Sequence, residues 1–325
     1  MRRGPLHPIS VAPMMDHTDR NFRVMMRMIS RRTLLYTEMI TTYAILHGKR
    51  DQLLGFDALE RPLSLQLGGD DPVALQACAK IAEDLGYDEI NLNCGCPSDR
   101  VQSGRFGACL MAHPERVAEG VAAMRAAVSL PVTVKHRIGI DDQDRYEDLR
   151  HFVDVVAQAG ADRFTVHARK AWLSGLSPKE NRTIPPLRYE DVYRLKAERP
   201  DLAIEINGGI TTLDQATQAL EHTDGVMIGR GVCDHPLLFA DVDRRFYGEP
   251  EQSISPAQVL EALIPYVEAH LARGGRLTGF ARHALPLMNG RPGARAYKRW
   301  LSTEAPKAGA DLSVWRAAVT QLKAA

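Results

Sequence analysis

The segment AIEINGGITTLDQATQALEHTDGVMIGRG spans residues 203–231 and contains two short apolar runs, 203–206 and 225–228. A helix-like segment, 211–220, lies between them and begins with two threonines, which suit the N-terminal cap of a helix. Two glycines follow the first run after Asn207, and Gly229 follows the second run directly. A buried strand, a glycine-containing turn and a helix in this order are typical of an α/β protein with parallel strands.

Runs of the same kind recur through the first 230 residues, at 9–12, 34–37, 63–67, 89–92, 132–134 and 164–166. Helix-like segments at 71–85, 114–128 and 146–159 lie between them. Their nearly continuous apolar character predicts strands buried on both faces. Eight such alternations over about 240 residues predict a closed (β/α)8 TIM barrel. A doubly wound open sheet, the alternative, usually has a glycine-rich turn after its first strand, whereas residues 12–15 are Ala-Pro-Met-Met.

The chain changes character at Gly-Glu-Pro-Glu, residues 248–251. Beyond it, the segments 256–273, 282–288, 293–302 and 312–323 have helical patterns and no strand pattern. We therefore predict a barrel domain over 1–247 and a small all-α domain over 255–325.

The composition is that of a globular protein, with 45% hydrophobic and 25% charged residues among 325. No apolar run has the length of a transmembrane helix or a signal peptide, so we expect a cytoplasmic protein without membrane contact. The net charge is +1, but residues 251–325 carry 10 basic and 5 acidic residues. A basic C-terminal end indicates either a polyanionic partner or a solvated helical face.

The working face of a barrel lies at the carboxyl ends of its strands. In this chain those ends are almost uniformly polar, and they supply Asp16, Glu38, Gln66, Asn91, Asn93, Lys135, Arg137, His167, Arg169, Asn207 and Arg230. Polar residues after eight apolar strands predict a binding site there.

The last two strand ends predict phosphate binding. Asn207-Gly208-Gly209 precedes a helix, and Gly229-Arg230 follows the eighth strand, where barrels commonly bind phosphate. Lys135 ends a buried strand and needs an acceptor or anion, which a reduced flavin would provide. Gln66 and Asn93 are suited to the edge of a heterocycle. His167, at the next strand end, is either part of this site or a structural histidine.

Five cysteines, an odd number, form no disulfide framework. Cys94 and Cys96 follow strand four, but their spacing with Cys109 fits no common zinc pattern, and we predict no metal site. One of the two on a loop over the barrel mouth would act as nucleophile or general acid, and spacing does not say which. Cys78 and Cys109 are expected to pack in the interior.

Ordered motifs at nearly every strand end resemble the tRNA-dihydrouridine synthases. These motifs are SVAPMMD (10–16), YTEM (36–39), LQLGG (65–69), NLNCGCPS (91–98), VKHRIG (134–139), HAR (167–169), INGG (206–209) and GR (229–230). The run AWLSGLSPKENR (171–182), followed by IPPL (184–187), resembles the A-type subfamily.

The resemblance implies a (β/α)8 barrel with a helical, tRNA-binding C-terminal domain, bound FMN, and NADPH as reductant. It implies reduction of the C5–C6 bond of D-loop uridines at positions 20 and 20a, with Cys96 as the catalytic acid and Asn93 binding the uracil. The residues expected to hold FMN are Pro13, Met14, Met15, Gln66, Lys135, His167, Asn207, Gly208, Gly209, Gly229 and Arg230. Those expected to contact tRNA are Lys179, Asn181, Arg182, Lys298 and Arg299. We expect a monomer that needs no protein partner.

Two positions depart from the family pattern. Cys94 stands where an aliphatic residue is usual, and we expect it to point into the packing. His136 replaces a small residue and should face away from the flavin, because neighbours on a strand alternate faces. Two rival functions remain: an FMN barrel oxidoreductase of a small pyrimidine or enone, and a non-catalytic RNA-binding barrel.

Overall fold

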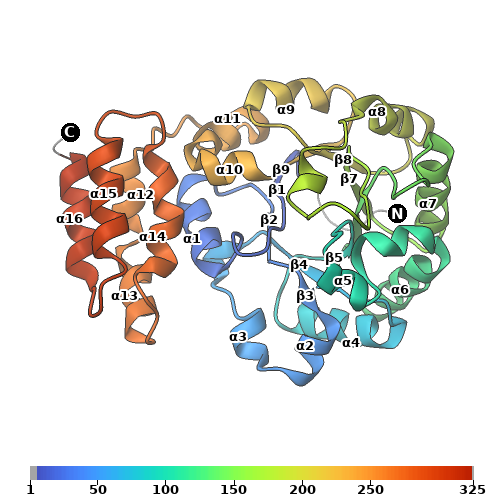
Figure 1. The fold of residues 1–325 in the computed structure, drawn as a ribbon, viewed down its shortest axis with the longest axis horizontal. Coiled ribbons are helices and arrows are strands. Elements are labelled where there is room, and N and C mark those ends of the chain that lie inside the picture. The colour runs from blue at the N-terminus through green and yellow to red at the C-terminus, as the bar shows by residue number, and fades with distance from the viewer. Residues whose placement is uncertain (1–5, 324–325) are drawn as a thin grey trace.

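The computed structural model describes residues 6–323 and shows a barrel of parallel strands beside a bundle of helices (Figure 1). The strands are β1 (Ile9–Val11), β2 (Leu35–Tyr36), β3 (Ile40–Thr41), β4 (Leu63–Gly68), β5 (Glu89–Cys94), β6 (Val132–Arg137), β7 (Arg163–His167), β8 (Ile204–Asn207) and β9 (Gly225–Ile228). Their order is β1-β9-β8-β7-β6-β5-β4-β2, with β3 paired to β4. The amide of Val11 donates to the carbonyl of Leu34 at 3.0 Å, which joins the two ends of this order. The prediction of a (β/α)8 barrel is confirmed.

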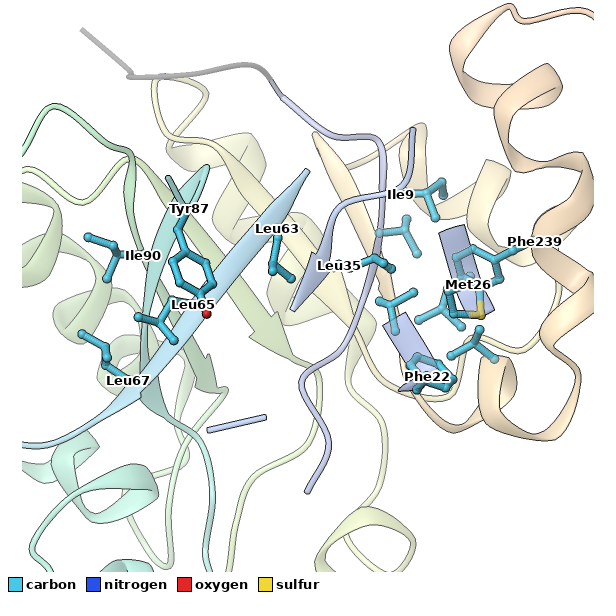
Figure 2. Packing of buried hydrophobic residues seen from close by; sticks show 14 of the residues in the cluster. Ile9, Phe22, Met26, Leu35, Leu63, Leu65, Leu67, Tyr87, Ile90 and Phe239 are labelled. Atoms are coloured by element: carbon cyan, nitrogen blue, oxygen red, sulfur yellow. The ribbon is translucent and has the colours of Figure 1, made fainter. Parts of the chain in front are cut away.

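The helices around the barrel are α1 (Arg20–Ile29), α2 (Thr42–His47), α3 (Arg50–Leu54), α4 (Pro72–Asp84), α5 (Asp99–Ser103), α6 (Pro114–Ala127), α7 (Tyr146–Gln158), α8 (Tyr189–Glu198), α9 (Leu213–Leu220), α10 (Arg230–Asp234) and α11 (Val242–Tyr247). Their apolar faces cover the outward side chains of the strands. Figure 2 shows Phe22 and Met26 of α1 packed near Ile9 of β1, Leu35 of β2 and Phe239. Burial of this apolar surface is the main stabilising contribution to the barrel.

The strands are buried on both faces, as predicted, but the face inside the barrel is polar, which the apolar runs did not predict. The Arg163 guanidinium on β7 donates to both carboxylate oxygens of Glu89 on β5, at 2.8 and 2.7 Å. It also donates to the Tyr36 hydroxyl on β2 at 2.8 Å. Since β2 and β7 are not neighbours in the sheet, this bond crosses the barrel. Strand alternation therefore places apolar residues against the helices and polar residues inside.

Five helices follow the barrel: α12 (Pro256–Ala262), α13 (Ile264–Ala272), α14 (Thr278–Ala284), α15 (Ala294–Glu304) and α16 (Leu312–Lys323). We call residues 256–323 the helical bundle; it packs around the buried Trp315 beside α1 (Figure 1). The single helix predicted over 256–273 is two helices, because Pro265 in the first turn of α13 has no amide hydrogen to continue α12. The helix predicted over 282–288 begins earlier, at Thr278, and ends in a 3₁₀ turn, Leu285–Met288.

No helix among residues 6–323 has the length and apolar character needed to cross a membrane.

Candidate active site

The carboxyl ends of the strands open into one cleft of about 1630 Å³. Most of the residues predicted for the site line it together: Pro13, Met14, Met15, Gln66, Asn93, Cys96, Lys135, His167, Arg182, Asn207, Gly208, Gly209, Gly229 and Arg230. Lys179, Asn181, Lys298 and Arg299 do not line this cleft. The chain thus brings residues from seven strand ends into one cavity, as barrels do at their catalytic face.

The cysteine loop begins where β5 ends, and Asn93 holds its first turn. The Asn93 side-chain oxygen accepts the amide hydrogens of Gly95 and Cys96, each at 3.0 Å. The Asn93 amide group donates to the Gln66 side-chain oxygen at 2.8 Å. The half-buried Cys96 thiol lies 3.6 Å from the Ser98 hydroxyl. Asn93 therefore fixes the direction in which the Cys96 side chain points into the cleft. This role does not depend on any ligand that Asn93 also binds.

We predict that Asn93→Ala slows turnover by about 10- to 100-fold, because misplacement of a reacting group by an ångström has an effect of this order. Single-turnover kinetics, started from protein in which the expected flavin has been reduced, would measure this loss of rate. Cys96 alkylation by iodoacetamide should quicken in the same variant as the loop loosens. Unchanged kinetics and alkylation would show that Asn93 does not place the thiol.

Cys94 is the neighbouring thiol that spacing alone could not distinguish from Cys96. It is fully buried on the outward face of β5, and burial raises its pKa. A buried, un-ionised thiol is inert. Cys78 is likewise buried, and burial raises the pKa of the half-buried Cys109. Within residues 6–323 no group of histidine, cysteine and acidic side chains is arranged to hold a metal ion.

Lys135 and His167 lie near the carboxyl ends of the neighbouring strands β6 and β7, where His167 is in register with Arg137. The Lys135 ammonium donates to the Asn207 side-chain oxygen at 3.2 Å, and Asn207 donates to the Met227 carbonyl at 2.8 Å. Burial, together with the charge of Arg137, lowers the pKa of Lys135 to about 8. Burial and the charges of Arg137 and Lys135 hold the pKa of His167 well below its usual value. At neutral pH the site therefore holds a lysine cation beside a neutral imidazole.

The turn after β8 requires glycine. Gly208 and Gly209 have φ angles of +116° and +72°, and a Cβ on Gly208 would approach the His167 ring at 2.6 Å. Glycine therefore lets this turn pack directly against the side chains of His167 and Leu187. Arg230, at the first residue of α10, donates to the Arg182 carbonyl at 3.1 Å. Both turns line the cleft, and phosphate binding by them stays a prediction.

Hydrogen bonds hold the loop after β1 in place at two points. Met14 donates its amide to the Thr18 hydroxyl at 3.1 Å. Asp16, which has a φ of +64°, donates its amide to the Glu38 carboxylate at 2.5 Å. Burial raises the pKa of Glu38. This anchoring leaves Met15 half exposed at the cleft.

Arg137 has a structural role that the sequence did not reveal. Its guanidinium donates to the Gly95 carbonyl at 2.9 Å, and to those of Lys170 and Asn181 at 2.9 and 3.0 Å. It thus ties the cysteine loop to the long loop 168–188. Its position two residues after Lys135 on one strand was the available signal, since both side chains face the barrel mouth. Burial lowers its pKa to about 10, so it stays cationic at neutral pH.

The residues expected to contact tRNA occupy different settings. Lys179 and Arg182 are exposed on the loop 168–188. Asn181 is fully buried, and its amide group pairs with the backbone of Trp172 and Leu176. The Asn181 side chain therefore holds this loop in shape and is not free to meet a macromolecule. Lys298 and Arg299 lie on α15, where Lys298 bonds to Asn289 and Arg299 borders a smaller cavity between α15 and α16.

His136 and Cys94 face outward as predicted. The His136 ring is fully buried, with its centroid 4.9 Å from that of Phe152 and 5.9 Å from that of Phe164. Neither residue reaches the cleft, so the departures at 94 and 136 leave its lining unchanged.

A parallel barrel whose cleft holds glycine turns, a buried lysine and a half-buried cysteine has the architecture of a (β/α)8 barrel enzyme. The comparisons narrow this class: residues 10–323 match the family model described as "Dihydrouridine synthase (Dus)". The chain belongs to the dihydrouridine synthase family, whose members are oxidoreductases.

Relatives called tRNA-dihydrouridine(20/20a) synthase cover most of the chain. One from Synechocystis sp. is 63% identical over 91% of this chain and 89% of its own length. Those from Shewanella oneidensis and Escherichia coli K12 are 57% and 56% identical, each over 94% of this chain and over 91% and 88% of their own lengths. A solved 2-naphthoyl-CoA reductase complex is 10% identical with a TM-score of 0.55, over 72% of this chain and 49% of that one. This last likeness concerns the fold alone.

Proposed function

We propose that this protein reduces the C5–C6 bond of uridines 20 and 20a in the D-loop of tRNA, using FMN and NADPH. Family membership and the names of the relatives support this substrate. The observation that carries the chemistry is that Cys96 is the one cysteine among the described residues that lines the cleft, and that Asn93 aims it there. A proton donor beside a buried cation suits the reduction of an electron-poor double bond.

The residues present fit FMN. Three cations of the cleft donate to neutral groups: Lys135 donates to an amide oxygen, and Arg137 and Arg230 donate to main-chain carbonyls. Such a site attracts an anion. The glycine turns at 208–209 and 229–230 would hold the phosphate, and Lys135, Gln66 and His167 would meet the ring edge. Pro13, Met14, Met15 and Asn207 would complete the lining.

Bound FMN, reduced by NADPH, supplies a hydride for C6 of the uracil. Side chains of this protein carry out the other steps. Lys135 and Arg137 stabilise the negative charge that develops on the oxygens of the uracil ring. Asn93 retains one amide hydrogen that can bind the uracil while its oxygen holds the cysteine loop. Cys96 donates its proton to C5, so the thiol is the working form. The uridine has to leave its stack to enter the cleft, at a cost of a few kcal/mol.

FMN binding to the apo-protein should weaken as pH rises through about 8, because the ammonium of Lys135 is then lost. The dissociation constant should rise by at most about tenfold per pH unit above that point. Fluorescence titration between pH 7 and 9.5 would measure it. In Lys135→Gln the dependence should flatten, since His167 is already neutral throughout that range. A pH-independent constant in the wild type would contradict this role of Lys135.

The helical bundle would bind the tRNA backbone through Lys298 and Arg299 on α15. Lys179 on the loop 168–188 and Arg182 at the cleft would add contacts. We expect Lys298→Ala with Arg299→Ala to weaken tRNA binding by about tenfold and to lower the slope of log affinity against log salt by about 1 to 2. The matched control is Lys323→Ala, because this exposed lysine on α16 already pairs with Glu261. Equal slopes in all three proteins would remove α15 from the binding surface.

Mapping dihydrouridine in an unmodified tRNA transcript, after incubation with the protein and NADPH, tests the proposed function. We expect the modified base at positions 20 and 20a only. Reduction of free uridine with tRNA left inert would favour a small-molecule oxidoreductase. Protein that binds tRNA but takes up no flavin when FMN is supplied would favour an RNA-binding barrel.

A further inference from the structure

The helical bundle meets the barrel at a cluster of charged groups centred on Asp19, directly after the loop that carries Met14 and Met15. The Asp19 carboxylate accepts from the Arg282 guanidinium on α14 at 2.5 Å, and its Oδ1 lies 2.9 Å from Nε2 of His283. The same Oδ1 accepts the amide hydrogen of Phe22 at 2.9 Å, which caps α1. Although burial opposes it, these hydrogen bonds lower the pKa of Asp19 to about 2. Asp19 is therefore ionised at neutral pH.

Close packing surrounds these charges. The His283 and Phe22 rings, both buried, meet edge to face with centroids 5.5 Å apart. Beside them, a Cβ on Gly279 of α14 would lie 2.9 Å from the side-chain nitrogen of Asn21. Alanine at 279 would therefore have to displace the side chains of Asn21 on α1 and of His270 on α13. We call Asp19, Asn21, Phe22, Gly279, Arg282 and His283 the interdomain joint.

The cleft runs past this joint. Asp19, Arg20 and Asn21 line its wall on the barrel side, and His270, Arg273 and Gly275 line it from the helical bundle. The same cavity reaches Cys96. A macromolecule that enters the cleft and also contacts α15 has to span both bodies, so their relative position sets how its target base meets Cys96.

We propose that the interdomain joint fixes the position of the helical bundle relative to the loop after β1 that carries Met14 and Met15, and that Asp19 is its positioning residue. The inference rests on the proposed function, since the joint acts by aligning bound tRNA with the cleft. It assigns no chemical step to Asp19. A misaligned tRNA would still bind, but its uridine would reach Cys96 less often.

Three substitutions probe the joint with different chemistry. Asp19→Asn keeps a good helix N-cap while removing the charge that faces Arg282. Arg282→Gln removes the opposite charge from the other side. Gly279→Ala inserts a methyl group and changes no charge. Glu261→Gln is the matched control, because it breaks an exposed ion pair, with Lys323, within the helical bundle and away from the joint.

The measurements are kcat and KM for tRNA, together with NADPH oxidation with oxygen as acceptor, all well below the unfolding temperature of each variant. Each joint variant should lose about tenfold or more in tRNA kcat/KM, mainly in kcat, since alignment rather than binding is impaired. Arg282→Gln and Gly279→Ala should keep wild-type flavin content and oxygen turnover. Asp19→Asn with Arg282→Gln should be no worse than either alone, as for two groups that act as one unit.

The direction in which Asp19→Asn changes tRNA binding and turnover distinguishes an aligning role of the joint from an effect of charge alone. Removing a negative charge would strengthen tRNA binding if only the field mattered, whereas Arg282→Gln would weaken it. Opposite effects of these two variants would overturn the proposal. So would a lowered unfolding temperature with unchanged tRNA kinetics, which would show a purely structural contact. A wild-type protein that leaves tRNA uridine unreduced would instead overturn the proposed function, and this inference with it.

Discussion

Replacing Cys96 with alanine should slow reduction of tRNA uridine by about 10²- to 10⁴-fold, the usual contribution of a positioned general acid. The variant lacks only the proton donor, because the lysine, the histidine and the glycine turns of the cleft are unaltered. Reduction of the flavin by NADPH should proceed at the wild-type rate. Single-turnover experiments that follow the two half-reactions separately would show this split.

Cys94→Ala is the matched control. The Cys94 side chain lies on the outward face of β5 among apolar residues, so this substitution should lower the stability of the fold and leave the reaction unchanged. Normal dihydrouridine formation by the Cys96 variant would remove Cys96 from the reaction. A defect in Cys94→Ala as large as that in Cys96→Ala would transfer the role to the neighbouring thiol.

Replacing Arg163 with methionine should destabilise the fold by about 3–5 kcal/mol, the usual cost of leaving buried partners unpaired. The guanidinium has two carboxylate neighbours inside the barrel, Glu89 at 2.7 Å and Glu205 at 3.8 Å. Without it, Tyr36 loses a donor and two acidic groups face each other in a water-poor interior. Urea unfolding, monitored by tryptophan fluorescence, would give the difference.

The control for Arg163 is Lys323→Gln, which removes a pair exposed by about half at both partners, 51% and 50%. Exposed pairs contribute about 1 kcal/mol or less. Equal costs for the two variants would mean that the interior network is not what holds the barrel together.

The barrel itself was predictable because its signal is local. Each strand is a short and mainly apolar run, and most strand ends carry polar or glycine residues such as Asn207 and Gly208. These features are read one segment at a time, and closure of the ring followed from their number. The family motifs then identified Cys96, and the outward direction of Cys94 agrees with strand alternation.

What the sequence did not reveal depends on contacts between distant segments. Arg137 bridges Gly95 and Asn181 across 42 and 44 positions of chain, and no local pattern encodes such a bridge. Asn181 lies in a polar run that looks solvent-facing, yet its side chain is buried by the fold of its own loop. The polar interior was not predicted, because Glu89 and Arg163 lie at the starts of their strands and Glu205 interrupts its apolar run only once.

The most direct test of the central claim is the absorbance of the flavin under anaerobic conditions. The protein would be reduced with NADPH, freed of excess reductant and mixed with unmodified tRNA transcript. We predict rapid return of the oxidised-flavin band with tRNA and no return with free uridine. A flavin that stays reduced with tRNA until oxygen is admitted would contradict the claim that tRNA uridine is the electron acceptor.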